Sequence, residues 1–232
     1  MDHALGIVVV ATHKMERTIH QIFFRFDSRK LRDYPVFVAS HKAFKRMRGW
    51  TYKLWNEKDV EQLCRTHYPG LWKTYRGLKY DIQRVDVAKY LLADSLGGVI
   101  VDLDVIPLTH ISNIVAGRPY VFDRCSRNGI IANDFFYVGA GGLPGIEAYF
   151  KKNLARINAI DAYKQRKMRY IFHSTGPDFF SRYLKRAGLA RHVQSLSNRS
   201  FLNPKQSHRN VRSTDPKLEI VHHLSWVPQL RK

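Results

Sequence analysis

The chain contains 232 residues, which is enough for one α/β domain with a substantial apolar core. Two cysteines, Cys64 and Cys125, are too few for a disulfide-stapled scaffold, and no apolar run reaches the roughly 18 residues of a transmembrane helix. Lys and Arg number 39 against 19 Asp and Glu, and the net charge of +20 attracts polyanions, with a basic surface that serves only solubility as the alternative.

Three kinds of anionic partner fit this charge: nucleic acid, an anionic membrane surface and anionic substrates. The sequence contains no RNA-binding, zinc-finger or helix-turn-helix signature, so we expect no specific nucleic acid. The apolar run Ala4–Ala11 is too short for a membrane span, and no basic residue precedes it as in a signal peptide. We therefore expect a cytoplasmic protein that attaches peripherally to an anionic membrane surface.

Strand and helix patterns alternate along the chain. Period-two and β-branched runs predict strands at Gly6–Ala11 or Thr18–Phe24, Val36–Ser40, Tyr52–Trp55, Val99–Asp104 and Phe135–Val138. Amphipathic spacing predicts helices at Asp59–Thr66, Asp81–Leu96, Ile146–Ile157 and Pro177–Ala187. This alternation is typical of a mostly parallel central sheet flanked by helices, with ligands bound at the carboxyl ends of the strands.

The helix predicted at Asp81–Leu96 leads directly into a strand. Gly97 and Gly98 end it, because glycine adopts the left-handed C-terminal cap conformation easily. Asp86 and Lys89 lie three residues apart and therefore share one helix face. By themselves they indicate an ordinary surface ion pair, but the following strand brings this face close to any ligand at the strand end.

Two acidic residues, Asp102 and Asp104, close the strand predicted at Val99–Asp104. Side chains two residues apart on a strand point to the same face, so we expect the two carboxylates to converge. Two ionised carboxylates this close repel each other, which favours a divalent metal between them. A solvated acidic strand end is the alternative for an isolated Asp-x-Asp pair.

The stretch from Val85 to Asp104 resembles the sugar-binding region of the DXD glycosyltransferases. That family includes fungal initiating α-1,6-mannosyltransferases and vertebrate α-1,4-galactosyl- and N-acetylglucosaminyltransferases, with clostridial glucosylating toxins as distant relatives. Further family landmarks follow in the expected order at Thr18–Ile22, Tyr52–Asn56, Asn133–Phe136, Ser174–Pro177 and His222–Trp226. Two features depart from the family: Lys89 replaces the usual Arg, and the shortened ending leaves open whether His222 or His223 carries the family's role.

The resemblance implies a GT-A-type single domain over residues 1–232, with a closing segment at about 194–232. It implies a metal-dependent, retaining glycosyltransferase that moves a sugar from a UDP- or GDP-sugar donor to a glycan or glycolipid acceptor. The polar stretch Gln194–Asp215 is consistent with a lid that lets the ending close over the donor.

The resemblance also assigns roles to individual residues. The metal, Mn²⁺ or Mg²⁺, would be held by Asp102, Asp104 and His223. The catalytic residues would be Asp102, Asp104 and Asp86. The donor would be bound by His20, Asp86, Lys89, Asp102, Ser225 and Trp226. The candidates for the acceptor side are Asn133 and Asp134.

Two other motif readings have weaker support. Haloacid-dehalogenase phosphatases also place Asp-x-Asp after an apolar strand, but this chain shows no clear downstream acidic pair, and its motif comes only after about a hundred residues. The run Val138–Gly142 resembles a dinucleotide-binding turn, but Pro144 occupies the third glycine position. We therefore expect a glycosyltransferase, with a phosphatase or a basic nucleic-acid- or membrane-binding protein as alternatives.

Overall fold

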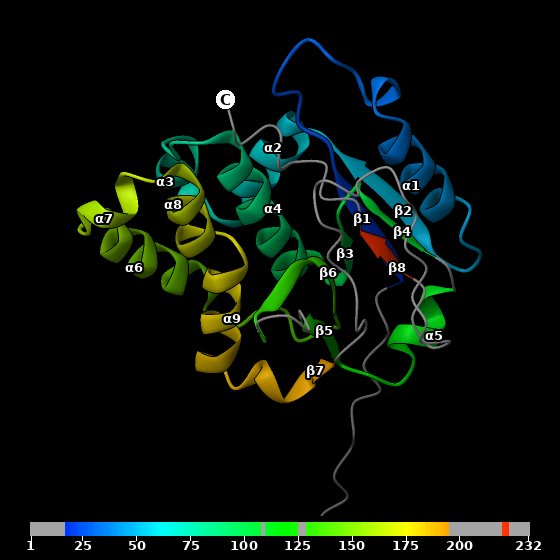
Figure 1. Cartoon of the computed structure of the whole chain (residues 1–232). Coiled ribbons are helices and arrows are strands. Elements are labelled where there is room, and N and C mark those ends of the chain that lie inside the picture. Colours follow the sequence, from blue (N-terminus) through cyan, green and yellow to red (C-terminus); the bar gives the residue numbers. More distant parts are fainter. Residues whose placement is uncertain (1–16, 108–109, 125–128, 195–219, 223–232) are drawn as a thin grey trace, which may run out of the picture.

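A six-stranded sheet forms the centre of the computed structural model, which describes residues 17–107, 110–124, 129–194 and the backbone of 220–222 (Figure 1). Its strands are β1 (Thr18–Ile22), β2 (Thr51–Trp55), β3 (Gly98–Val101), β5 (Tyr120–Arg124), β6 (Ile131–Val138) and β7 (Val193–Gln194), in the order β2-β1-β3-β6-β5-β7. β1 runs parallel to β2 and β3, and β5 runs parallel to β7, whereas β6 is antiparallel to β3 and β5. The predicted mostly parallel α/β fold is confirmed.

A second sheet contains two short antiparallel strands, β4 (Val105–Pro107) and β8 (Ile220–His222). His222 lies opposite Val105 in this pairing. β8 therefore brings a backbone segment from near the end of the chain beside the residue that follows Asp104.

Helices cover both faces of the central sheet (Figure 1). They are α1 (Pro35–Lys45), α2 (Glu57–His67), α3 (Trp72–Arg76), α4 (Asp81–Leu96), α5 (Ile111–Val115), α6 (Ile146–Asn158), α7 (Asp161–Lys164), α8 (Lys167–Ser174) and α9 (Pro177–Arg186). Short 3-10 turns occur at Leu31–Asp33, Pro69–Leu71 and Leu189–His192. Across the described ranges, none of the helices combines the length and the apolar character needed to cross a membrane.

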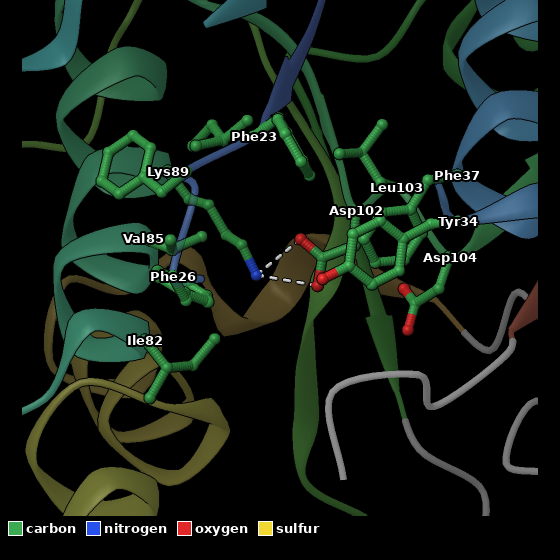
Figure 2. Close-up of a pocket in the computed structure, with 12 residues that line it drawn as sticks. Phe23, Phe26, Tyr34, Phe37, Ile82, Val85, Lys89, Asp102, Leu103 and Asp104 are labelled. Atoms are coloured by element: carbon green, nitrogen blue, oxygen red, sulfur yellow. Dashed lines mark hydrogen bonds and ion pairs between the residues drawn. The ribbon is translucent and has the colours of Figure 1, made fainter. Parts of the chain in front are cut away.

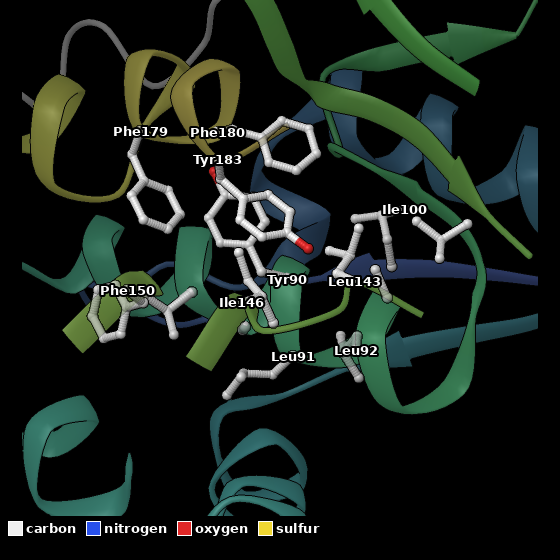
Figure 3. Close-up of a cluster of buried hydrophobic side chains, with 14 of the residues drawn as sticks. Tyr90, Leu91, Leu92, Ile100, Leu143, Ile146, Phe150, Phe179, Phe180 and Tyr183 are labelled. Carbon is white, nitrogen blue, oxygen red and sulfur yellow. The ribbon is translucent and has the colours of Figure 1, made fainter. Parts of the chain in front are cut away.

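Two apolar cores lie on opposite faces of the sheet, since alternate residues of β3 and β6 enter different cores. The larger core joins α2, α4, α6 and α9. At its centre, Tyr90 of α4 stacks on Phe180 of α9 with ring centroids 4.9 Å apart (Figure 3). The smaller core packs α1 and α5 against the other face through Phe44 and Ile111. The central sheet is thus buried on both sides, as the apolar run of β3 requires.

The predicted strand at Val36–Ser40 is wrong, because these residues lie inside α1. Pro35 occupies the first helical turn, where its fixed φ angle suits the helix and its missing N–H is not needed. Ser40 and Phe44 lie four residues apart on one face of the helix and are both completely buried. Packing of this face on the sheet therefore outweighs the strand preference of the β-branched residues.

The connection from α4 to β3 depends on two glycines. Gly97 caps α4 with a φ of 64°, and Gly98 begins β3 with a φ of 91°. A β-carbon at Gly98 would collide with the carbonyl oxygen of Thr18 in the neighbouring strand β1. The Gly-Gly pair thus allows α4 to pass directly into the centre of the sheet.

His20 occupies the middle of β1, opposite Lys53 of β2 and Ile100 of β3. Its side chain is 2% exposed, and its Nδ1 accepts a hydrogen bond of 3.0 Å from the indole N–H of Trp55. Burial lowers the pKa of His20 to about 4, and the charge of Lys53 acts in the same direction. His20 is therefore a neutral buried side chain at physiological pH.

We expect Gly98→Ala to destabilise the protein by roughly 1–3 kcal/mol from its backbone conformation alone, with a further loss from the collision with Thr18. Gly117→Ala is the matched control, because Gly117 has a similar φ of 68° but no atom within 4 Å of an added β-carbon. Denaturant midpoints measure both losses. Equal destabilisation by the two variants would show that the strand contact at Gly98 is unimportant.

We expect the buried His20 to make the free energy of unfolding decrease as the pH falls from about 6.5 to 4. The unfolded chain binds a proton to this imidazole near pH 6.5, whereas the folded chain binds it only near pH 4, so acid favours unfolding. The difference corresponds to about 3 kcal/mol. His20→Gln should flatten this part of the stability profile, and an unchanged profile would contradict the assignment.

Candidate active site

The two acidic residues lie in a turn between β3 and β4. β3 ends at Val101, and the turn is closed by a hydrogen bond of 3.1 Å from the N–H of Val105 to the carbonyl of Asp102. The predicted strand at Val99–Asp104 is therefore too long. Because Asp102 and Asp104 lie in a turn, the alternation of side chains along a strand does not determine where their carboxylates point. In Figure 2 the Asp102 carboxylate faces Lys89, whereas that of Asp104 faces away from Lys89.

Buried polar side chains hold this turn at both ends. The Gln21 amide donates hydrogen bonds to the Ser40 hydroxyl (2.8 Å) and to the carbonyl of Asp102 (3.3 Å). The Ser40 hydroxyl in turn donates to the carbonyl of Val105 at 2.5 Å. The hydroxyl of Tyr52 donates a hydrogen bond of 2.8 Å to the side-chain amide oxygen of Gln21. β1, β2 and α1 thus position the acidic turn through its backbone.

Lys89 connects α4 with the acidic turn. Its ammonium lies 2.6 Å and 2.8 Å from the two carboxylate oxygens of Asp102 and 3.6 Å from Asp86 (Figure 2). Only 4% of the Lys89 side chain is exposed, compared with 23% for Asp102. Burial by itself would lower the pKa of Lys89, but the charges of Asp102 and Asp86 outweigh it and raise this pKa above the ordinary value. Lys89 is therefore a permanently charged cation inside the site.

Asp86 lies behind Lys89 in a buried hydrogen-bond network. Its carboxylate accepts hydrogen bonds from the Asn133 amide at 3.0 Å and from the Thr175 hydroxyl at 3.1 Å. The Asn133 amide also donates to the hydroxyl of Tyr90 at 2.9 Å, and this hydroxyl donates to the carbonyl of Thr175 at 2.7 Å. Asp86 is consequently held in one orientation by residues from β6 and from the segment before α9.

The site carries more negative than positive charge. Burial raises the pKa of Asp102; Lys89 opposes this shift, and the nearby carboxylates of Asp104 and Asp134 add to it. Asp86 lies in the same region, and burial raises its pKa as well, against the pull of Lys89. One lysine among four carboxylates gives an environment that favours a further cation.

A pocket opens above the acidic turn and is lined by Lys89, Asp102 and Asp104 on its polar side. An aromatic wall is built from Phe23, Tyr34 and Phe37, whose rings contact one another, and Phe26 lines the pocket on the side of Val85 and Ile82 (Figure 2). The rings of Tyr34 and Phe37 stack on each other with centroids 4.8 Å apart. Such a pocket suits a ligand with an anionic part beside the charges and a planar or apolar part against the rings.

Sequence reasoning missed this aromatic wall. The signal was available, since Phe23, Phe24 and Phe26 form a dense aromatic run close to Tyr34 and Phe37. Assigning residues 36–40 to a strand separated Tyr34 from Phe37, which face the same pocket once the segment is helical. The roles of Gln21 and Ser40 had no comparable signal, because they depend on contacts across the sheet.

The structure brings together only part of the predicted site. Lys89, Asp102 and Asp104 line the pocket, whereas Asp86 and Asn133 lie behind it and contact each other. The proposed acceptor-side residue Asn133 is therefore a neighbour of the donor-side candidate Asp86. Its companion Asp134 lies beside the turn, where its carbonyl accepts a hydrogen bond of 2.8 Å from the N–H of Asp102.

Other predicted residues lie elsewhere. His20 does not line the pocket and packs against Trp55 within the sheet. His223, Ser225 and Trp226 lie outside the described residues. Within the described ranges, no group of three or more His, Cys, Asp or Glu side chains could hold a metal ion. The functional roles of these candidates remain predictions.

Comparisons with known proteins point to the same region. A family model described as "Glycosyltransferase sugar-binding region containing DXD motif" matches residues 25–121, which include α4 and the acidic turn. Mannosyl phosphorylinositol ceramide synthase SUR1 of Saccharomyces cerevisiae is 29% identical over 132 residues, which are 57% of this chain and 33% of that protein. Inositol phosphoceramide mannosyltransferase 3 of Schizosaccharomyces pombe is 34% identical over 56 residues, which are 24% of this chain and 16% of that protein. The chain thus matches about a third or less of these relatives.

A solved structure supports the fold. The PaToxG glycosyltransferase superposes with a TM-score of 0.50 at 14% sequence identity, covering 74% of this chain and 68% of that one. At this identity the likeness concerns the arrangement of helices and strands, and it is consistent with the GT-A-type fold expected from the sequence. The family match over residues 25–121 thus shows that this part of the chain, which contains α4 and the acidic turn, is similar to the sugar-binding region of glycosyltransferases with a DXD motif.

Proposed function

We propose that this protein is a metal-dependent, retaining glycosyltransferase that takes its sugar from a nucleoside-diphosphate donor. The observation that carries the proposal is the acidic turn Asp102–Asp104, which forms the floor of a pocket between a buried cation and an aromatic wall. Its two carboxylates suit a divalent cation, Lys89 suits phosphate or sugar hydroxyls, and the rings suit a base. The family match over the same residues supports this assignment.

The residues present fit a hard divalent cation such as Mn²⁺ or Mg²⁺. Carboxylate oxygens are the ligands that such ions prefer, and the surplus negative charge around Asp102 favours a cation at this place. Two carboxylates leave the remaining coordination positions to water, to phosphate oxygens and to His223, the ligand that the family resemblance implies. When bound, the ion would act as a Lewis acid that stabilises the negative charge of the leaving diphosphate.

The remaining chemistry is assigned to residues of the chain. Tyr34 and Phe37 stack against the donor base and orient it. The ammonium of Lys89 donates hydrogen bonds to a sugar hydroxyl or phosphate oxygen, and Asp86 holds that ammonium in place. The carboxylates near the anomeric carbon stabilise the positive charge that develops as the glycosidic bond breaks. We assign Ser225 and Trp226 to a closing segment over the donor within a single catalytic domain.

We propose a glycan or glycolipid acceptor, and among these an inositol-containing phospholipid. The names of the relatives describe mannosyl transfer to such a lipid in two yeasts. The net charge of +20 is consistent with an anionic acceptor at an anionic membrane surface. Mannose and its GDP carrier are accordingly the first sugar and donor to test, with UDP-sugars as the alternative.

We expect Asp102→Asn and Asp104→Asn each to reduce sugar transfer by at least about a hundredfold, because each removes a charged oxygen ligand from the leaving-group site. Transfer from GDP- and UDP-sugars to a glycolipid acceptor is the measurement, with circular dichroism to verify folding. Asp161→Asn is the control, because Asp161 is an exposed acid on α7, with a side chain 85% exposed. Wild-type transfer by both Asn variants would contradict the proposal.

We expect a metal chelator to abolish transfer while the circular dichroism spectrum stays unchanged. The described fold rests on two apolar cores, in which each buried Leu, Ile or Phe contributes about 1.5–3 kcal/mol, and not on a metal cluster. Mn²⁺ added in excess should restore transfer. Unfolding on chelation would show instead that the metal is structural.

A further inference from the structure

The ammonium of Lys89 forms an ion pair with the carboxylate of Asp102, which is also a proposed ligand of the metal. The ammonium lies within hydrogen-bonding distance of both oxygens of Asp102, at 2.6 Å and 2.8 Å, and is 4% exposed. Water therefore screens this ion pair poorly. A divalent ion at the same carboxylate would have to lie close to a like charge.

We propose that Lys89 is an internal counter-ion that competes with the divalent metal for Asp102, so that metal and donor diphosphate bind cooperatively. This inference rests on the proposed function, because it concerns the same metal and donor. In the absence of donor, Lys89 neutralises Asp102 and weakens metal binding. A diphosphate in the pocket attracts the ammonium away from Asp102 and leaves that carboxylate to the metal.

The surroundings of Lys89 offer its ammonium other partners than Asp102. Asp86 lies 3.6 Å away on the other side and is held by Asn133 and Thr175, so it can keep the lysine charge compensated when Asp102 binds metal. Lys89 also lines the pocket, where an anionic ligand would meet it. Its flexible stem and compact charge allow a small shift between these partners more easily than a planar guanidinium would.

The test compares the binding of Mn²⁺ alone to the full chain and to its variants, followed by the loss of the electron paramagnetic resonance signal of free Mn²⁺. Lys89→Met and Lys89→Gln should bind Mn²⁺ about tenfold more tightly than the wild type, within the usual range of coupling between two sites. Lys89→Arg keeps the charge and should bind as weakly as the wild type. Lys164→Met is the matched control. Lys164 pairs with Asp161 at the same i,i+3 spacing as Lys89 with Asp86, but on the exposed helix α7.

Saturating UDP or GDP provides the second arm. Either nucleotide that binds the pocket should tighten Mn²⁺ binding strongly in the wild type and clearly less in Lys89→Gln, which has no ammonium to release. If neither nucleotide changes the affinity of the wild type for Mn²⁺, the cooperative part of the proposal is wrong.

Removing Lys89 leaves Asp86 and Asp102 without their cation, so the neutral variants should melt at lower temperature. Mn²⁺ should then raise the melting temperature of Lys89→Gln more than that of the wild type, which gives a readout independent of activity. If Lys89→Met and Lys89→Gln fold but bind Mn²⁺ no more tightly than the wild type, the counter-ion role is overturned while the proposed function stands. If neither the wild type nor any variant binds Mn²⁺, with or without nucleotide, the metal dependence falls as well.

Discussion

The buried ion pair between Lys89 and the carboxylates of Asp102 and Asp86 is the interaction on which the site depends. It joins the middle of α4 to the turn after β3, two elements that the Gly97–Gly98 connection already places side by side. An exposed pair of this kind contributes less than about 1 kcal/mol, whereas removing one partner of a buried pair costs about 3–5 kcal/mol. The difference arises because the remaining charge would be left in a poorly hydrated place.

The rest of the fold supports this pair from several directions. Asn133 of β6 and Thr175 orient Asp86 from behind. Gln21 and Ser40 hold the backbone of the acidic turn from β1 and α1. The charged side chains of the pocket are therefore attached to well-supported elements, as the proposed binding of an anionic substrate requires. The aromatic wall lines the same pocket and offers an apolar surface to a ligand there.

Much of the fold follows from local sequence patterns. The helix predicted at Asp81–Leu96 has the same bounds as α4, because an amphipathic run and the two glycines that end it agree. The helices predicted at Ile146–Ile157 and Pro177–Ala187 each differ from α6 and α9 by one residue. The helix at Val36–Ser40 was mistaken for a strand, since a short apolar run with two valines reads equally well both ways until its packing is known. The sequence did not predict strands β4, β5, β7 and β8 or the short helices α3, α5, α7 and α8.

The sequence by itself determined the family resemblance, the acidic pair Asp102 and Asp104, and the order of the main helices and strands, because these features are local in the chain. Only the tertiary structure decided that the two acids lie in a turn, that Lys89 binds Asp102 across the helix–sheet interface, and that Gln21 holds the turn through its backbone. Gln21 and Asp102 are 81 residues apart. Contacts of this kind depend on how the sheet is ordered and on which side of it each helix packs, and neither is encoded in the spacing of neighbouring residues.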